Sequence, residues 1–476
     1  MASDIGIKYT LHNFSSGTIS QPTRDSLTSL GVKFVRVQWV DLLNNVRFRV
    51  LPLSHFLKLL KTPRPGVAVT KCVFGLVFIQ LVPGFDAVGE YLYAVDLSSL
   101  RLCPYAPGHA VVFGFFQEKT PLLGPNGPSF QVPLCPRTNL QQLLTYAKVN
   151  LDAQFLVGFE TEFILLKSTN PIVAANNYGW SNSPALLTGT VEAQVLEEIA
   201  GALAEAGIEL QMYHSEAAPG QYEVVTGPLP PLEAADALVQ TRETIFNIAS
   251  KHGLRATLAP RLNADNCGSG AHTHISVHGS SRGVSNSEYL NPLESSFLAG
   301  LLEHLPSIIA FTLPLRASYE RMKDGIWSGG TWACWGVDNR EAPVRLANAT
   351  SPSSRNFEIK TVDGTSSPYL ALLGLLGAGI LGINENKALV ARNCEGPKTA
   401  AQMTDAERAA MGITKRMPLN IEQARDYLQA DEAVKDILGP KFVDMFIKVN
   451  ETLVTAMDGP EGENKDVTNV RLVENY

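Results

Sequence analysis

The stretch Phe155–Leu165, FLVGFETEFIL, is an apolar run that two glutamates interrupt, Glu160 and Glu162. Its length and its aromatic and branched residues predict a β-strand. Successive side chains of a strand point to opposite faces, so residues i and i+2 share one face. Both carboxylates therefore project from one side of a strand that is otherwise apolar, and the rest of the fold has to accommodate them.

Three further segments carry the same kind of polar side chain. They are HSEAAPGQYE (214–223) with Glu216 and Glu223, GSGAHTHIS (268–276) with His272 and His274, and FEIK (357–360) with Glu358. One such carboxylate alone is more often a solvated surface group. Several that face one cavity repel one another and are costly to desolvate, and a divalent cation relieves that cost. Carboxylate oxygens with an imidazole suit Mg²⁺ or Mn²⁺ better than zinc or copper, so we predict a metal cluster.

Arginines form a second group of candidates within forty residues of sequence. They are Arg316, Arg321, Arg340, Arg345 and Arg355, in loop-like text rich in Gly, Trp and Asn. Taken alone they could be a surface salt-bridge zone. Beside a metal cluster they predict a phosphate clamp, because the guanidinium fork matches phosphate and carboxylate oxygens. The sequence has no GxxxxGK[ST] motif, which argues against a P-loop enzyme.

The organisation of the chain favours an α+β protein with a β-rich front and a larger body. Val32–Leu51 predicts a hairpin that turns at Asn44–Asn45, and Lys119–Arg137, rich in Pro and Gly, predicts a domain boundary or linker. Val191–Ala206 is an amphipathic helix pattern that Gly207 ends. The apolar stretch Tyr369–Ile383 is shorter than the ~20 residues of a membrane span, so it predicts a buried helix.

Composition narrows the class of protein. The chain has 476 residues, 45% of them hydrophobic and 18% charged, with a formal charge of −7. This excludes global disorder and argues against a nucleic-acid binder, which needs a basic face. The N-terminus lacks a signal-peptide pattern and no CxxC pair occurs among the cysteines. We therefore expect a cytoplasmic protein with reduced thiols, without nucleic acid or membrane as partners.

The same motifs resemble the glutamine synthetase family, and most of all its fungal FluG-type and γ-glutamyl-amine ligase branch. The resemblance covers about residues 20–450 and includes, in the order of the family, GFETEF, HSEAAPGQYE, GSGAHTHIS, SYERM, DNREAPVR and SPYLALLGLLGAGI. It implies a small N-terminal β-grasp domain over 1–120. A catalytic domain over 121–476 would follow, with an antiparallel active-site sheet flanked by helices. It also implies a ring-shaped homo-oligomer, a decamer or dodecamer, and activation of a carboxylate by ATP as an acyl phosphate that an amine then attacks.

The resemblance assigns roles position by position. One metal would bind Glu162, Glu216 and Glu223, and the metal that bridges the ATP phosphates would bind Glu160, His272 and Glu358. The nucleotide and its phosphates would contact His274, Ser276, Arg345 and Arg355, and Arg340 would stabilise the transferring group. The acid substrate would contact Arg321, Gly268 and Lys360.

This chain departs from the family pattern where the family binds ammonium. Trp327 stands where the family flap has a glutamate, and no Asp-Gly-Ser-Ser loop occurs between Thr62 and Glu90. In addition, Cys267 replaces an Asn, Lys360 replaces an Arg and Asn356 replaces an Arg. Ammonium needs negative charge and a base, whereas a tryptophan offers an apolar wall and a π face. We therefore expect Trp327 to take part in binding an amine larger than ammonia, with glutamate as the favoured acid because Arg321 is present.

Three alternatives stay open from the sequence. The chain could be a glutamine synthetase that uses ammonia. It could be a non-catalytic, ring-forming regulatory or developmental protein that keeps the fold, although a full ligand set would then be a burden without metal. An amide hydrolase that runs the reverse chemistry is a weaker option.

Overall fold

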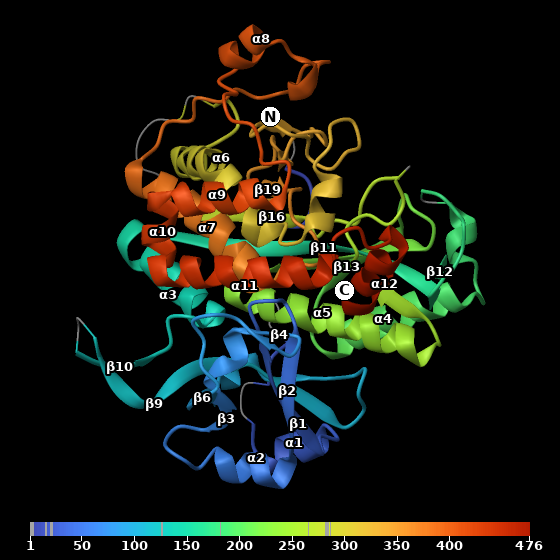
Figure 1. The fold of residues 1–476 in the computed structure, drawn as a ribbon, viewed down its shortest axis with the longest axis vertical. Coiled ribbons are helices and arrows are strands. Elements are labelled where there is room, and N and C mark those ends of the chain that lie inside the picture. Colours follow the sequence, from blue (N-terminus) through green and yellow to red (C-terminus); the bar gives the residue numbers. More distant parts are fainter. Residues whose placement is uncertain are drawn as a thin grey trace.

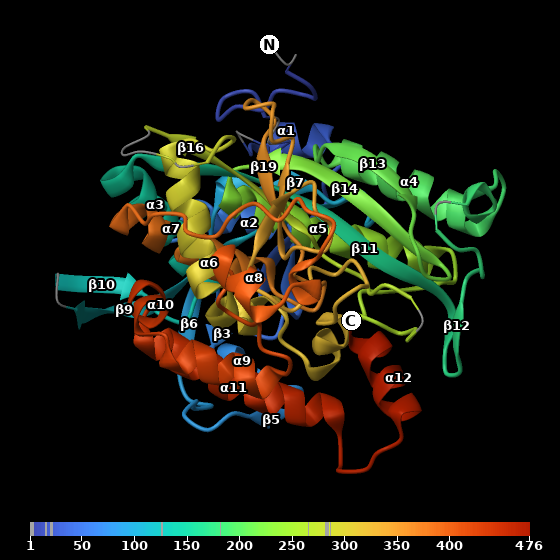
Figure 2. The same cartoon turned by 90° about the horizontal axis from the view of Figure 1, so that it is seen from above.

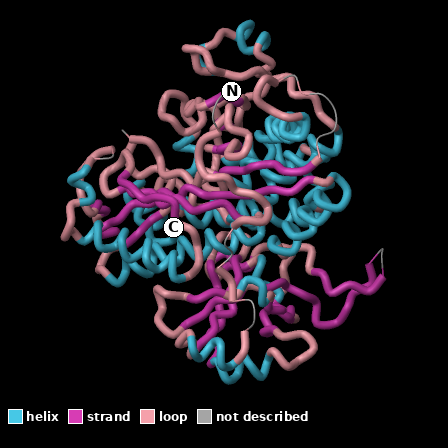
Figure 3. Tube along the Cα trace, turned by 180° about the vertical axis from the view of Figure 1, so that it is seen from behind, coloured by secondary structure: helices cyan, strands magenta, loops and turns pink. Residues whose placement is uncertain are grey.

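The computed structural model describes residues 4–14, 17–19, 22–124, 127–180, 182–264, 266–280, 285 and 287–476. Residues 24–131 form a small, strand-rich part below a larger body of helices and sheet (Figure 1). The view from behind separates the two parts clearly, with strands dominating the lower one (Figure 3). The predicted α+β class with an N-terminal sheet domain and a catalytic sheet domain is confirmed.

Two four-stranded sheets, in the orders β2-β1-β8-β7 and β10-β9-β6-β3, make up most of the N-terminal part. Its elements are α1 Arg24–Ser29, β1 Phe34–Val40, β2 Val46–Pro52, α2 Leu53–Leu59, β3 Gly66–Thr70, β4 Leu76–Val77, β5 Gln80–Leu81, β6 Glu90–Val95, β7 Arg101–Leu102, β8 His109–Val112, β9 Gly114–Gly124 and β10 Gly127–Gln131. The predicted hairpin is confirmed: β1 and β2 pair antiparallel, and Asn44 has a φ of 67° in the turn.

The prediction of a linker over Lys119–Arg137 is wrong for most of that segment. Strands β9 and β10 form a hairpin that continues the second sheet as far as Gln131. The two prolines within these strands, Pro121 and Pro128, are compatible with strand structure. Pro128 lies on the edge strand β10, and Pro121 lies beyond Glu118, the last residue of β9 that pairs with β6. The division of the chain after residue 120 stays a prediction.

The body is built on a nine-stranded sheet whose main path is β13-β14-β11-β16-β19-β18-β17. Its strands are β11 Ala153–Thr169, β12 Ile172–Ala174, β13 Leu210–Ser215, β14 Gln221–Leu229, β15 Arg255–Thr257, β16 Thr273–Gly279, β17 Trp335–Val337, β18 Val344–Ala347 and β19 Asn356–Ile359. Neighbours pair antiparallel except β17 and β18. The long strand β11 contains the opening sequence motif and crosses the molecule between β14 and β16 (Figure 2).

Helices cover this sheet and connect its strands. They are α3 Pro136–Leu151, α4 Val191–Glu205, α5 Pro231–Lys251, α6 Pro292–Thr312, α7 Pro368–Glu385, α8 Asp405–Ala410, α9 Ile421–Ala430, α10 Glu432–Leu438, α11 Pro440–Asp458 and α12 Lys465–Asn475. The buried helix predicted over Tyr369–Ile383 is confirmed as α7. It crosses α6 closely, since a Cβ on Gly300 would lie 2.6 Å from the Cα of Gly382.

One helix in the described part of the chain, α6, is long and apolar enough to cross a membrane by length and composition alone. Of its most apolar window, 89% is buried inside the protein, against α7 and the sheet. A core helix has this same composition.

Candidate active site

The register of the sheet brings the predicted acidic side chains together. Glu162 on β11 lies opposite Glu223 on β14, and His274 on β16 lies opposite Glu358 on β19. Glu358 in turn lies opposite Arg345 on β18. Cross-strand neighbours of this kind have their Cβ atoms about 5 Å apart, so five strands concentrate charge on one face of the sheet.

The first cluster consists of Glu216, Glu223 and His214. Single ligand atoms of the three lie within 4.8 Å of one another. His214 Nε2 is 3.5 Å from Glu223 Oε1, and His214 Nδ1 is 3.7 Å from Glu216 Oε1. Burial and the charge of Glu162 raise the pKa of Glu216 to about 7. Burial, together with the charges of Glu160 and Glu162, raises the pKa of Glu223 to about 8 against the opposing hydrogen bond from His214.

Glu162 lies beside this cluster and is held by other groups. Its Oε2 accepts hydrogen bonds from the backbone N–H of Gly270 (2.9 Å) and from Gln221 Nε2 (3.0 Å). Gln221 also donates to Ser269 Oγ at 3.1 Å. The Oε1 of Glu162 stays 3.8 Å from His272 Nε2 and faces the cavity side. Gln221 is thus a positioning residue for a predicted metal ligand.

The second cluster consists of Glu160, His272, His274 and Glu358. Glu160 bridges the histidines, with Oε2 2.7 Å from His272 Nδ1 and Oε1 3.0 Å from His274 Nε2. His272 Nδ1 lies 3.5 Å from Glu358 Oε1. Burial opposes ionisation of Glu160, but the neighbouring imidazoles outweigh it and hold the pKa of Glu160 well below its usual range. Burial also opposes charge on His274, yet the charge and hydrogen bond of Glu160 raise its pKa to about 9.

Two cationic side chains, those of Arg345 and Lys360, also contact the carboxylate of Glu358. Arg345 donates to Glu358 Oε2 at 2.8 Å, and Lys360 Nζ donates to Oε1 at 3.2 Å. Burial disfavours the charge on Glu358, but Lys360 and then the two histidines outweigh burial and lower its pKa to about 2. Lys360, which the sequence assigned to the acid substrate, therefore contacts a predicted metal ligand. Lys360 lies two residues after Glu358 and one residue past the end of β19, close enough for this contact.

The donor sets of both clusters fit a hard divalent cation. Their ligands are carboxylate oxygens with imidazole nitrogens and no thiolate within the groups described, which is the set that Mg²⁺ and Mn²⁺ accept. Burial, together with the charges of neighbouring glutamates, raises the pKa values of Glu216 and Glu223, and a bound cation would relieve the cost of ionising them. The sequence placed Glu162 in the first set and His272 in the second. In the structure, the two groups whose ligand atoms lie within 4.8 Å of one another contain His214 in place of Glu162 and His274 in place of His272.

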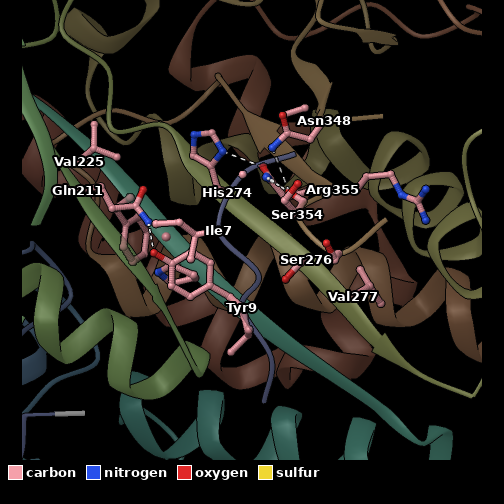
Figure 4. Close-up of a pocket in the computed structure, with 18 of the residues that line it drawn as sticks. Ile7, Tyr9, Gln211, Val225, His274, Ser276, Val277, Asn348, Ser354 and Arg355 are labelled. Atoms are coloured by element: carbon pink, nitrogen blue, oxygen red, sulfur yellow. Dashed lines mark hydrogen bonds between the residues drawn. The ribbon is translucent and has the colours of Figure 1, made fainter. Parts of the chain in front are cut away.

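The larger of two cavities, of about 870 Å³, opens on the side of β16. Its lining includes the predicted residues His274, Ser276, Arg345 and Arg355. Figure 4 shows His274, Ser276 and Arg355 with Ser354 along one side, facing Ile7, Tyr9 and Gln211 across the pocket.

Two of these predicted residues have protein partners that lie away from the metal clusters. Ser276 Oγ hydrogen-bonds His278 Nε2 at 2.8 Å. Arg355 forms a two-pronged ion pair with Glu294, at 3.1 and 2.7 Å, so most of its fork is occupied. His274 and Arg345 are the better placed of the four, because both lie at the inner end beside the second metal cluster.

An N-terminal strap, residues 4–9, forms the outer wall of this cavity. On one side Ile5 N donates to Ser351 Oγ (2.9 Å) and Ser354 Oγ donates to Ile5 O (2.8 Å). On the other side Tyr9 OH donates to Glu209 Oε1 (2.5 Å) and accepts from Gln211 Nε2 (2.7 Å). The strap thus connects two walls of the pocket that are distant in sequence.

The second cavity, of about 470 Å³, contains the first metal cluster and the predicted acid-binding and amine-binding residues. Its lining includes Gly268, Arg321, Trp327, Arg340 and Lys360, together with Cys267. Arg340 is exposed at the rim and has no ion pair among the described residues. The two cavities meet at Glu160 and Arg345, which line both.

Arg321 depends on the glycines of the GSGAHTHIS motif. Its side chain is buried, and NH1 donates to Val362 O at 3.0 Å while Nε has no partner among the described groups. A Cβ on Gly268 would lie 2.5 Å from Arg321 Cγ, and one on Gly270 would lie 2.5 Å from His272 Nε2. Both glycines are therefore required by the close approach of Arg321 and His272, and Arg321 itself contributes to the lining of the cavity.

Sequence reasoning missed several residues that the fold brings to the site. His214 and Gln221 lie within a motif that was already singled out, so their place in it could have flagged them. Trp180 and Tyr9 lie in segments without any local pattern. Only tertiary contacts place them, and a single sequence contains no signal for such contacts.

The fold places the protein in a class of known structures. A solved structure described as the crystal structure of a novel glutamine synthase homolog superposes with a TM-score of 0.76 and 26% sequence identity, covering 96% of this chain and 100% of that chain. The sequence is more specific: a family model for the glutamine synthetase catalytic domain matches residues 133–460. The chain therefore belongs to the glutamine synthetase family.

Two curated relatives give the family its context. The protein fluG of Emericella nidulans is 36% identical over 439 residues, which is 90% of this chain and 48% of that protein. This chain thus spans about half of fluG. The γ-glutamylpolyamine synthetase GlnA3 of Streptomyces coelicolor is 29% identical over 448 residues, with 89% of this chain and 90% of that protein covered.

Proposed function

We propose that this protein is an ATP-dependent ligase that joins a carboxylic acid, with glutamate favoured, to an amine larger than ammonia, giving a γ-glutamyl amide. The observation that carries the proposal is the junction of the two cavities at Glu160 and Arg345. A phosphoryl group that leaves a nucleotide in the larger cavity would reach an acid in the smaller one across this junction, whose wall also includes Met212 and Val225.

The reaction balances as two transfers. An oxygen of the acid's side-chain carboxylate attacks the γ-phosphorus of ATP, and ADP leaves. The amine nitrogen then attacks the acyl carbon, phosphate leaves with that oxygen, and the nitrogen loses a proton. When bound, Mg²⁺ or Mn²⁺ supplies charge neutralisation for the phosphate oxygens.

Each group of residues would have a role that follows from its position in the two cavities. Glu216, Glu223, His214 and Glu162 would hold one cation, and Glu160, Glu358 and a histidine of the 272–274 pair would hold the other. Arg345 and the free guanidinium of Arg340 would stabilise the transferring phosphoryl charge. Arg321, which lines the smaller cavity, would bind the α-carboxylate of the acid.

The larger amine follows from the composition of the smaller cavity. Trp327 lines it where the family places a glutamate, and a relative that covers nearly the whole chain is named for γ-glutamylpolyamines. Beyond the metal clusters, the described lining residues include no carboxylate that could hold an ammonium ion. A glutamine synthetase that uses ammonia is the alternative within the same chemistry.

Assembly and location extend the proposal from the family. We expect a cytoplasmic homo-oligomeric ring, a decamer or dodecamer, that works on small molecules. A non-catalytic ring-forming protein would keep the fold without turnover, but the half-buried carboxylate of Glu216 and the buried one of Glu223, both near the charges of Glu160 and Glu162, argue for metal binding.

One assay separates these options. Purified protein is incubated with ATP, Mg²⁺, glutamate and either ammonia or a panel of amines, and ADP release and product mass are read together. The proposal expects ADP and a γ-glutamyl amide with an organic amine and weak turnover with ammonia. Strong turnover with ammonia alone would identify a glutamine synthetase, and no ADP release with any acceptor would identify the non-catalytic alternative.

A further inference from the structure

Two exposed tryptophans lie side by side in the lining of the smaller cavity. The ring centroids of Trp180 and Trp327 are 5.5 Å apart, with the planes tilted by 53°. The side chains are 59% and 50% exposed, whereas Trp39 and Trp335 are 3% exposed. Single exposed apolar residues are common, but two adjacent tryptophans from distant segments that line one cavity make a specific binding surface.

The backbone at Trp327 is held in a conformation that bulky residues avoid. Its φ is 60°, in the left-handed region, which glycine adopts easily and a residue with a bulky side chain adopts only with strain. Glu341 fixes the loop by accepting hydrogen bonds from Trp327 N at 2.8 Å and Gly325 N at 3.0 Å. The loop thus projects the indole of Trp327 against Trp180, where it meets the cavity.

The shape of the pair determines how a ligand can use it. Because the rings already contact one another, no slot is open between them, and a ligand has to lie against their common outer surface. An aromatic ring there makes offset or edge-to-face contacts with both indoles. Methylammonium and ammonium are too small to cover such a surface.

The charges of the cavity exclude a second class of amine. The carboxylates in its described lining are Glu160, Glu162, Glu216 and Glu223, all within or beside the metal clusters, and the other charged lining residues, apart from His214 and His272, are Arg321, Arg340, Arg345 and Lys360. The distal ammonium of a polyamine would therefore find cations and indole faces but no free anion. An uncharged apolar body has no such requirement.

We infer that Trp180 and Trp327 form an aromatic wall that selects a primary monoamine with an aromatic body, such as an arylalkylamine. The amine stacks its ring on this wall and directs its nitrogen toward the acid held in the same cavity. This inference rests on the proposed ligase function and names the amine that the ligase takes. Trp180 acts as a second specificity residue beside Trp327.

The test compares three amines with matched variants. 2-Phenylethylamine, methylamine and putrescine are assayed with the wild type, Trp180→Ala, Trp327→Ala and Trp180→Phe. Tyr427→Ala is the control, because Tyr427 is an exposed aromatic on α9 outside both cavities. We expect kcat/KM for 2-phenylethylamine to exceed that for the other two amines, to fall ~10-fold or more in each alanine variant through KM, and to be largely kept in Trp180→Phe. The KM for ATP should stay unchanged.

A binding measurement keeps the two proposals separable. Binding of 2-phenylethylamine, with ADP, Mg²⁺ and glutamate present, is measured by titration calorimetry in the wild type and both alanine variants. Preference for putrescine or methylamine, or equal use of 2-phenylethylamine by the alanine variants, would overturn the aromatic wall and leave the ligase intact. If no amine gives an amide, the proposed ligase function is wrong. In that case, loss of 2-phenylethylamine binding in the alanine variants would still support the aromatic wall, and unchanged binding would overturn it.

Discussion

At the residue scale, Gly268 leaves space for the side chain of Arg321, the residue proposed to bind the acid. A Cβ there would lie 2.3 Å from Pro260 O and 2.5 Å from Arg321 Cγ, so Gly268→Ala has to displace Arg321. We expect the KM for the acid to rise ~10-fold, equivalent to about 1.4 kcal/mol of binding free energy, with the KM for ATP nearly unchanged. The matched control is Gly201→Ala on the exposed side of α4, where nothing lies within 4 Å and the change should slightly stabilise the helix. An unaltered KM for the acid in Gly268→Ala would contradict this role.

Also at the residue scale, the first cluster predicts that metal binding releases protons. The pKa values of Glu216 and Glu223, about 7 and about 8 without metal, leave both carboxylates partly protonated at neutral pH. Because these values lie above those of the unfolded chain, raising the pH through 7–8 removes stability from the metal-free protein and favours the metal-bound form. The affinity for Mg²⁺ or Mn²⁺ should rise from pH 6 to pH 8, and the gain in Tm on adding metal should be larger at pH 8.

Calorimetry in two buffers of different ionisation enthalpy counts the protons released in this metal titration. Glu216→Gln is the matched variant and should release fewer protons and bind metal more weakly. Proton uptake, or an affinity that does not depend on pH, would contradict the charged cluster.

At the element scale, the N-terminal strap predicts a separable effect on the nucleotide. Tyr9 ties the strap to Glu209 and Gln211 and contributes its ring to the wall of the larger cavity. Tyr9→Ala should raise the KM for ATP several-fold while the KM values for acid and amine stay the same, because those substrates would use the other cavity. Tyr9→Phe keeps the ring and loses the hydrogen bonds, so an intermediate value is expected. If the alanine variant raises the KM for the acid instead, the two cavities have been assigned in the wrong order.

The elements also show what a single sequence can and cannot predict. The period-2 alternation around Glu160 and Glu162 placed both carboxylates on one strand face, and the strand register then brought Glu223 opposite Glu162. The Pro and Gly content of Lys119–Arg137 predicted a linker, yet edge position lets Pro128 sit in a strand. His214, Trp180 and Tyr9 join the site through contacts between segments, and local pattern has no bearing on such contacts.

At the scale of the whole molecule, the family predicts a ring. Light scattering coupled to size-exclusion chromatography should give a particle mass that is a multiple of the 51.6 kDa chain, near ten or twelve copies. If active sites lie between neighbouring subunits, specific activity should fall on dilution together with that mass. A fully active species at the mass of one chain would contradict the ring.

The most direct test of the whole account follows one oxygen atom. Glutamate labelled with ¹⁸O in its side-chain carboxylate is incubated with ATP, Mg²⁺, 2-phenylethylamine and the purified protein, and the inorganic phosphate and the amide are analysed by mass spectrometry. The acyl-phosphate mechanism predicts one ¹⁸O in each phosphate released and an equal amount of γ-glutamyl amide. The labelled oxygen attacks the γ-phosphorus and then leaves the acyl carbon as part of the inorganic phosphate. Phosphate without the label, or ADP release without amide, would contradict an acyl-phosphate ligase.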